Sequence, residues 1–148
     1  MRLSALLLTA ALAACVAAEP PGPRTASPAA LLPQGGTWQI TRADGMDAPP
    51  SHVATLTLTR QGIGGDTGCN QYSGDARITA TALDFSEIGQ TERACADASA
   101  MAFERRVVAA LTRADGVAGT PGGPLTLTAG GAEIARLVPL LVPPRMAN

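Results

Sequence analysis

Alternating apolar and polar positions are the commonest pattern in the middle of the chain. Between His52 and Arg60, the apolar residues Ala54, Leu56 and Leu58 alternate with threonines, which is the period expected of a strand with one buried face. Similar runs occupy residues 37–42, 76–82, 83–88, 125–128 and 132–138, and turns such as Asp-Gly and Pro-Gly-Gly separate them. We therefore predict about seven short strands arranged as antiparallel hairpins.

One stretch has helical spacing instead. From residue 98 to about residue 112, apolar side chains recur on one helix face, and charged side chains lie off it. The apolar stripe comprises Phe103, Val107, Ala110 and Leu111, and the residues off it are Glu104, Arg105 and Arg113. Asp97 and Ser99 are candidate N-terminal caps. These elements predict the α+β class, with a curved antiparallel β-sheet of about seven short strands and one packed α-helix.

Four aromatic residues are available to fill the core. They are Trp38, Tyr72, Phe85 and Phe103, and we expect them inside because large rings supply much of the buried area of a small core. We predict that Trp38 and Phe103 belong to one cluster with Leu56, Leu58 and Leu111.

The first residues have the pattern of an export signal. Arg2 precedes an uncharged run of about 12 residues that ends in Leu12-Ala13-Ala14-Cys15, too short for the ~20 residues of a membrane-spanning helix. This ending resembles a bacterial lipoprotein signal, in which the cysteine thiol is acylated. We predict that residues 1–14 are the signal peptide and that Cys15 is lipidated. The alternative is an ordinary signal cleaved after residues 16–18.

Proline content divides the rest of the chain. Residues 16–34 contain five prolines, which oppose regular structure, so we predict a tether over residues 15–34 whose Leu31 and Leu32 are candidate contacts with the domain. The folded domain is predicted over residues 35–138, and a Pro-rich tail over residues 139–148. We expect the protein in the bacterial cell envelope, anchored by its lipid to the outer membrane and facing the periplasm.

Composition and motifs argue against several functions. A net charge of -1 does not supply the basic face that nucleic acid requires. The glycine-rich segment 62–68 has Thr67 where a dinucleotide-binding loop needs glycine, so we interpret the segment as a turn. His52 is the only histidine, and one histidine with two cysteines makes no zinc site without carboxylates borrowed from elsewhere. We predict no catalytic residue, no metal and no cofactor.

The two cysteines that remain if Cys15 is lipidated are Cys69 and Cys95. An exported compartment is oxidising, so we predict that they form a disulfide with each other. A redox-active pair would have the close spacing of a Cys-x-x-Cys motif, and here the spacing is wide. The bond is therefore expected to be structural.

Several segments resemble one family. They are Gly68-Cys69-Asn70-Gln71-Tyr72-Ser73-Gly74, then Thr91-Glu92-Arg93-Ala94-Cys95, then a helix carrying Phe103 and Leu111. Together they resemble the META domain of the heat-shock protein HslJ and related bacterial lipoproteins, although relatives often carry Met at the position of Arg93. The resemblance implies a small α+β domain associated with heat shock, drug tolerance or secretion, and it implies no established catalytic residues.

Three functions are then open. The first is a non-catalytic lipoprotein that binds or scaffolds an envelope protein, with Asn70, Gln71 and Tyr72 as its interaction surface. The alternative for these residues is structural, with Asn70 supporting a left-handed turn and Tyr72 in the core with its hydroxyl satisfied at the edge. The second is a carrier of a small apolar ligand between sheet and helix. The third is an unrecognised enzyme, for which a pocket pairing His52 with a carboxylate would argue.

Overall fold

The structure of the chain is a computed structural model that describes residues 26–50 and 52–140. The predicted signal peptide, Cys15 and most of the predicted tail lie outside the described residues. Within the described part of the chain, no helix combines the length and the apolar character needed to cross a membrane.

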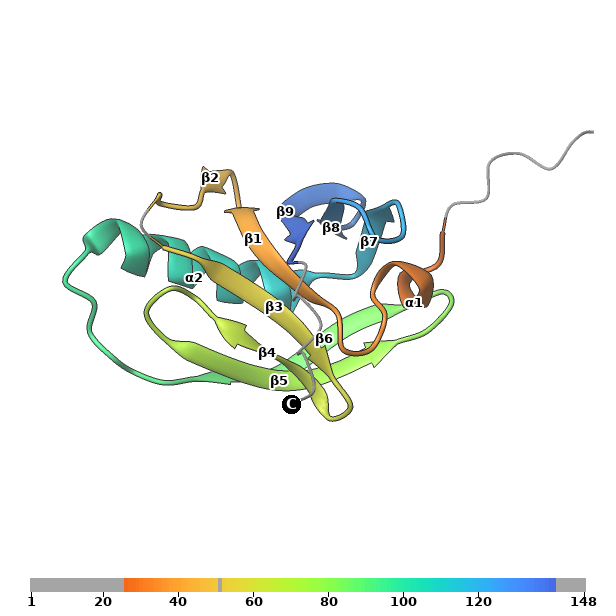
Figure 1. Cartoon of the computed structure of the whole chain (residues 1–148), viewed down its shortest axis with the longest axis horizontal. Helices are drawn as coiled ribbons and strands as arrows, with labels where there is room; N and C mark the ends of the chain where they lie inside the picture. The colour runs from red at the N-terminus through yellow and green to blue at the C-terminus, as the bar shows by residue number, and fades with distance from the viewer. Residues whose placement is uncertain (1–25, 51, 141–148) are drawn as a thin grey trace, which may run out of the picture.

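The described residues form two helices and nine strands (Figure 1). In chain order these are α1 (Pro28–Leu31), β1 (Thr37–Ala43), β2 (Met46–Asp47), β3 (Ala54–Thr59), β4 (Gly62–Asp66), β5 (Gln71–Ile78), β6 (Leu83–Gln90), α2 (Ala98–Arg113), β7 (Gly116–Gly119), β8 (Leu125–Ala129) and β9 (Ala132–Pro139). The strands pair in the order β6-β5-β4-β3-β1-β9-β8-β7, with β2 on β1, and every pairing is antiparallel.

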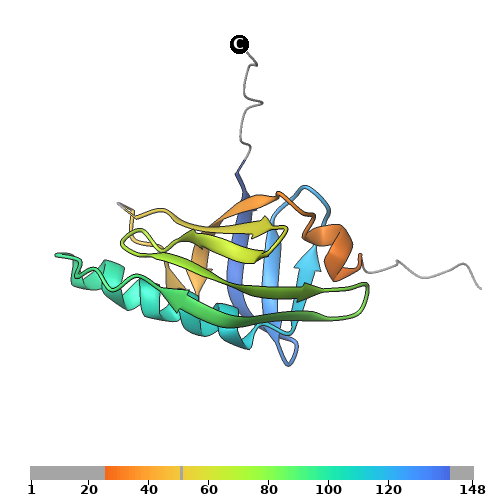
Figure 2. The same cartoon turned by 90° about the horizontal axis from the view of Figure 1, so that it is seen from below.

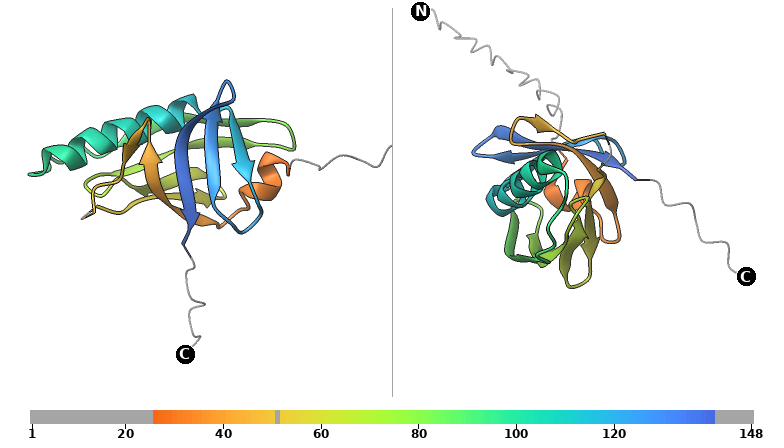
Figure 3. Two further views of the ribbon diagram at one scale, coloured as in Figure 1. Left: turned by 90° about the horizontal axis from the view of Figure 1, so that it is seen from above. Right: turned by 90° about the vertical axis from the view of Figure 1, so that its left-hand side faces the viewer.

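The sheet curls into a half-barrel, and α2 packs along its open side (Figures 2 and 3). The helix contacts β6 on one side of the opening and β1, β2 and β9 on the other. The first and last strands of the sheet, β6 and β7, also contact each other. The predicted α+β class, a curved antiparallel sheet with one main helix, is confirmed.

The strand count is higher than predicted because β2, β4 and β7 lie outside the predicted runs, and the glycine-rich segment is the strand β4 rather than a turn. Residues 62–64 pair with β3, and residues 63–66 pair with β5. Gly65 shows why glycine suits this strand. A Cβ there would collide with the carbonyl oxygen of Thr55 and lie 2.8 Å from the ring of Tyr72, so glycine lets the ring pack directly on the strand.

The core lies between the inner face of the curled sheet and α2. Trp38, Tyr72, Phe85 and Phe103 are all buried, as predicted. Trp38 and Phe103 belong to one buried cluster with Leu56, Leu58 and Leu111, so the predicted core assignment is confirmed.

The folded part of the chain begins earlier than predicted. Residues Pro28–Leu31 form α1, and both Leu31 and Leu32 are buried in the core cluster. Ser27 caps this short helix, with its Oγ accepting a hydrogen bond from Ala30 N at 3.3 Å. Pro28 stands at the helix start, where its missing N–H would have no partner within the helix. The expectation of no regular structure over residues 15–34 is therefore wrong at its C-terminal end.

Candidate functional site

The most unusual side chain in the interior is a carboxylate. Glu104 on α2 is only 5% exposed, although the spacing of apolar residues predicts that it lies off the buried stripe. That prediction is wrong because Glu104 lies four residues after buried Ala100 and three before buried Val107, positions that share one helix face. This i, i+4 and i, i+3 spacing is the signal in the sequence that could have revealed it.

Three neighbouring side chains donate hydrogen bonds to Glu104. The amide nitrogen of Asn70 lies 3.1 and 2.9 Å from its two carboxylate oxygens, and the Thr67 hydroxyl lies 2.7 Å from one of them. Gln90 Nε2 donates to the other oxygen at 3.2 Å. A buried carboxylate is tolerated when donors replace the water it has lost. Among the described residues, every buried side-chain nitrogen and oxygen has a hydrogen-bond partner.

Asn70 also fastens the segment that precedes α2. Its side-chain oxygen accepts hydrogen bonds from the Thr91 hydroxyl at 2.8 Å and from Arg93 N at 2.7 Å, and its nitrogen lies 3.1 Å from Arg93 O. We refer to Thr67, Asn70, Gln90, Thr91 and Glu104 as the Glu104 network. It ties the turn between β4 and β5, the end of β6 and the middle of α2 into one corner of the half-barrel.

The turn between β4 and β5 has Gly68 as its left-handed residue and is closed by hydrogen bonds between Thr67 and the backbone of Asn70. Gly68 has a φ of 91°, a left-handed conformation that glycine adopts readily, and its N–H donates to Asp66 Oδ1 at 2.6 Å. Asn70 itself has no positive φ, but it supports the turn that contains Gly68, as the structural alternative for this residue predicts. Its side chain also makes hydrogen bonds of the Glu104 network.

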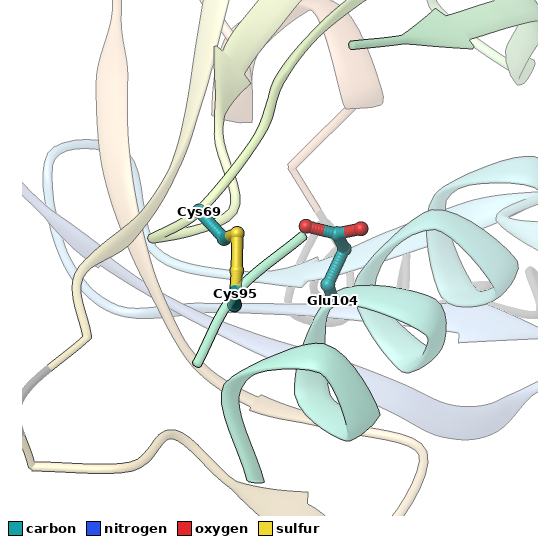
Figure 4. A group of neighbouring side chains, drawn as sticks. All are labelled: Cys69, Cys95 and Glu104. Carbon is teal, nitrogen blue, oxygen red and sulfur yellow. A yellow bond between two sulfur atoms is a disulfide. The ribbon is translucent and has the colours of Figure 1, made fainter. Parts of the chain in front are cut away.

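The predicted disulfide between Cys69 and Cys95 is present in this corner (Figure 4). The two Cα atoms lie 6.1 Å apart, within the usual range for such a bond. Both cysteines are partly exposed. The bond joins the β4–β5 turn to the segment before α2, so it reinforces the same connection that Asn70 makes.

The predicted interaction residues are divided between interior and surface. Asn70 and Tyr72 are buried at 2% and 4% exposure, which withdraws both from any contact surface, whereas Gln71 between them is exposed. The Tyr72 hydroxyl donates to Thr55 O at 2.7 Å, as the structural alternative for this residue anticipates. Burial raises the pKa of Tyr72 well above its usual value, because ionisation would place a charge in the core.

The single histidine meets a carboxylate at the start of α2. His52 Nδ1 lies 3.7 Å from Asp97 Oδ2. Asp97 is the helix cap, accepting hydrogen bonds from the Ser99 hydroxyl at 2.6 Å and from Ser99 N at 2.8 Å. These bonds hold the pKa of Asp97 below its usual value. The contact therefore fastens the loop before β3 to the N-terminal end of α2.

Comparison with protein families identifies the fold. A family model described as the META domain matches residues 30–139, which include the half-barrel and the whole corner around Glu104. The chain belongs to the META domain family. The matched range also begins within α1, in agreement with the early start of this META domain in the structure.

Solved structures share the fold of this META domain. A protein from Burkholderia xenovorans, determined by NMR, has a TM-score of 0.64 at 24% sequence identity, over 88% of this chain and 99% of the other. A second protein, also determined by NMR, has a TM-score of 0.56 at 18% identity, over 72% of this chain and 90% of the other. No curated protein matches the sequence.

The segments that resemble META domains build the corner of the half-barrel. Gly68 makes the turn, Cys69 and Cys95 make the disulfide, and Asn70 holds Glu104. Arg93 departs from the residue that relatives often carry. Its hydrogen bonds to Asn70 are made by its backbone N–H and carbonyl, not by its side chain. Its side chain can therefore differ without loss of these hydrogen bonds.

Proposed function

We propose that this chain is a non-catalytic envelope lipoprotein whose META domain binds or scaffolds an envelope protein. The lipid on Cys15 would hold the protein at the outer membrane, and the proline-rich residues before α1 would separate the domain from the bilayer. The resemblance to HslJ and its relatives supports a role in envelope stress or drug tolerance. The domain is then a rigid unit presented to partners in the periplasm.

One observation supports the binding role: buried bonds hold the corner around Glu104 together, and its outer surface is polar. The disulfide and the Glu104 network hold the turn and the end of β6 together. On the outside, Gln71, Ser73, Gln90 and Thr91 are exposed around a hollow of about 470 Å³. We call these four residues the corner surface. A surface fixed in advance loses little conformational entropy when it binds.

The corner surface is uncharged and rich in amide and hydroxyl groups. The side chains of Gln71 and Ser73, which are not part of the Glu104 network, can recognise a partner by hydrogen bonds to its polar atoms, and the orientation of each bond gives specificity. The proposed partner is therefore another folded envelope protein with a polar surface. Gln71 is the best single reporter, because it is exposed and its backbone is fixed by pairing with Asp66.

Site-specific photo-crosslinking in living cells tests this proposal. A photoreactive residue placed at Gln71 should give a discrete crosslinked product containing an envelope protein. The matched control places the same residue at Glu133, which is exposed on β9 and lies four strands from β5 in the sheet. Equal products from both positions, or none from Gln71 in lipidated protein, would contradict the corner surface.

A second candidate function is a carrier of a small apolar ligand, at a different place from the one predicted. Phe85, Phe103 and Leu111 occupy the space between sheet and helix. An apolar hollow of about 350 Å³ lies elsewhere, beside Leu31, Trp38 and Leu140. Trp38 is the only tryptophan, so its fluorescence reports on this hollow. A saturable change when a fatty acid is added, absent in Leu140→Gln, would support the carrier.

A further inference from the structure

Three side chains that can ligate a metal meet at the corner of the half-barrel. The sulfur atoms of Cys69 and Cys95 and a carboxylate oxygen of Glu104 all lie within 4.8 Å of one another, and Figure 4 shows the carboxylate of α2 beside the disulfide. The cysteines come from the β4–β5 turn and from the segment before α2. The helix thus supplies a carboxylate as a third ligand beside the two cysteines, which by themselves are too few for a zinc site.

We propose that reduction of the Cys69–Cys95 disulfide creates a zinc site formed by the two thiolates, the Glu104 carboxylate and one water molecule. A dithiol reductant donates two electrons and two protons, becomes a disulfide itself, and leaves two cysteine thiols. Zinc then binds both sulfurs and displaces the two thiol protons to solvent. The corner would therefore be closed by a covalent bond when oxidised and by a metal ion when reduced.

The distances require only small movements. Zinc binds sulfur at about 2.3 Å and carboxylate oxygen at about 2.0–2.2 Å, so tetrahedral ligand atoms lie about 3.5–3.8 Å apart. The present separations between Glu104 and the two sulfurs are at most 4.8 Å. Once the disulfide is broken, the two sulfur atoms separate to a non-bonded distance. The Cα separation of 6.1 Å then leaves room for a metal ion between the two side chains when each sulfur atom moves by roughly 1 Å.

The ligand set favours zinc among common divalent ions. Thiolates exclude magnesium and calcium, which prefer oxygen ligands, and two thiolates with one carboxylate and a water suit the borderline character of zinc. Neighbouring groups are placed to orient the ligands. Thr67, Asn70 and Gln90 hold the carboxylate, and Asn70 Nδ2 lies 3.7 Å from Cys69 Sγ, where an N–H group stabilises a thiolate.

The site is also accessible. A hollow of about 300 Å³ opens beside Glu104, and Asn70, Gln90 and Glu92 are among the residues that line it. Both cysteines are partly exposed, so a reductant can reach the disulfide. The hollow gives solvent access to the Glu104 side of the site, from which the water that completes four ligands can come.

The inference is tested by measuring metal binding to the reduced full-length protein. The protein is reduced with a phosphine, the phosphine is removed without oxygen, and Zn²⁺ is titrated against a chromophoric chelator. We expect one Zn²⁺ per reduced chain, none in the oxidised protein, and a higher Tm when Zn²⁺ is bound. Co²⁺ in place of Zn²⁺ should give a tetrahedral spectrum with a sulfur-to-cobalt charge-transfer band.

Two variants separate this site from adventitious binding by thiols. Glu104→Gln should weaken Zn²⁺ binding by at least about 10-fold, the lower end of the cost of losing even an indirect partner of a metal. Glu92→Gln, an exposed carboxylate beside the same hollow, should bind as the parent does. The double variant Cys69→Ser, Cys95→Ser should give no charge-transfer band.

Equal Zn²⁺ affinity in the parent and in Glu104→Gln would overturn the proposal, because it would show that the two thiols bind Zn²⁺ without the carboxylate, as they would in an unfolded chain. A failure of Zn²⁺ to raise the Tm of the reduced parent would overturn it as well. If Glu104→Gln does not fold, the Co²⁺ spectrum of the parent decides: tetrahedral coordination with two sulfurs supports the site, and octahedral coordination refutes it.

Discussion

The side-chain amide of Asn70 donates hydrogen bonds to both carboxylate oxygens of Glu104, at 3.1 and 2.9 Å, across 34 residues of sequence. Asn70 lies in the turn that closes one hairpin, and Glu104 lies in the middle of the helix that covers the sheet. Their contact joins the turn to the helix at this corner, together with the bonds that Thr67 and Gln90 make to Glu104. Because both groups are buried, neither can exchange its partner for water without cost.

Removing the amide should therefore destabilise the domain strongly. Asn70→Ala leaves a buried carboxylate short of donors and frees the segment before α2, so we expect the free energy of unfolding to fall by about 3 kcal/mol. Chemical denaturation of the oxidised protein measures this. The control is the neighbouring exposed residue, for which Gln71→Ala should change the value by less than about 0.5 kcal/mol. Similar losses in both variants would refute the role assigned to Asn70.

The ring of Phe103 should contribute more to stability than any surface position of α2. Phe103 is fully buried, and Phe103→Ala removes its contacts and leaves a cavity, so we expect a loss of about 3–5 kcal/mol. Arg105→Ala, on the exposed face of the same helix, is the control for helix propensity. A loss below about 1 kcal/mol for Phe103→Ala would show that the core relaxes around the missing ring.

Stability should fall in alkaline solution because of Tyr72. Its pKa in the folded protein is raised by burial above the usual 10.0, so the unfolded chain loses this proton first. The contribution to stability is complete below about pH 10 and is lost above it, at about 1.4 kcal/mol per pH unit. The chain has one tyrosine, whose absorbance reports its ionisation directly.

The variant Tyr72→Phe isolates this effect. All eleven basic residues are arginine, and arginine does not titrate near pH 10, so lysine does not complicate the interval. The variant should be less stable at neutral pH, because Thr55 O loses its donor, yet should lack the steep decline above pH 10. A decline of equal slope in both proteins would assign the alkaline transition to another group.

The disulfide should add a substantial part of the stability. It closes a loop with a sequence separation of 26 residues, for which the chain-entropy model gives about 3.5 kcal/mol. Reduction should lower the free energy of unfolding by roughly that amount when no metal is present. Peptide mapping without reductant should recover the peptides of Cys69 and Cys95 linked to each other. Recovery of both as free thiols from exported protein would refute the bond.

Lipidation of Cys15 is a separate prediction, made from sequence alone. Mass spectrometry of the exported protein should find an N-terminal peptide that begins at acylated Cys15. Cys15→Ala should release the protein from the membrane fraction, because several acyl chains on one terminus provide firm anchoring. An unmodified mature terminus at Glu19 would instead support cleavage as an ordinary signal.

Local pattern determined much of this fold before any tertiary contact was known. The alternation through Leu56 and Leu58 predicts a strand with one buried face, and the spacing of Phe103, Val107 and Leu111 predicts the helix. Both patterns record which side of an element must leave water, which is a property of the element itself. The cysteine pairing also follows from sequence, since two cysteines allow one bond once Cys15 is set aside.

The sequence did not determine which partner each polar backbone or side-chain group would contact in the folded protein. Gly62–Asp66 has the composition of a turn, and it is a strand because β3 and β5 pair with its two edges and the ring of Tyr72 packs on Gly65. Asn70 and Glu104 have the side chains of surface residues. They are buried because folding brings an amide and a carboxylate together, and each replaces the water lost by the other. That compensation joins distant parts of the chain, so only the tertiary structure could decide it.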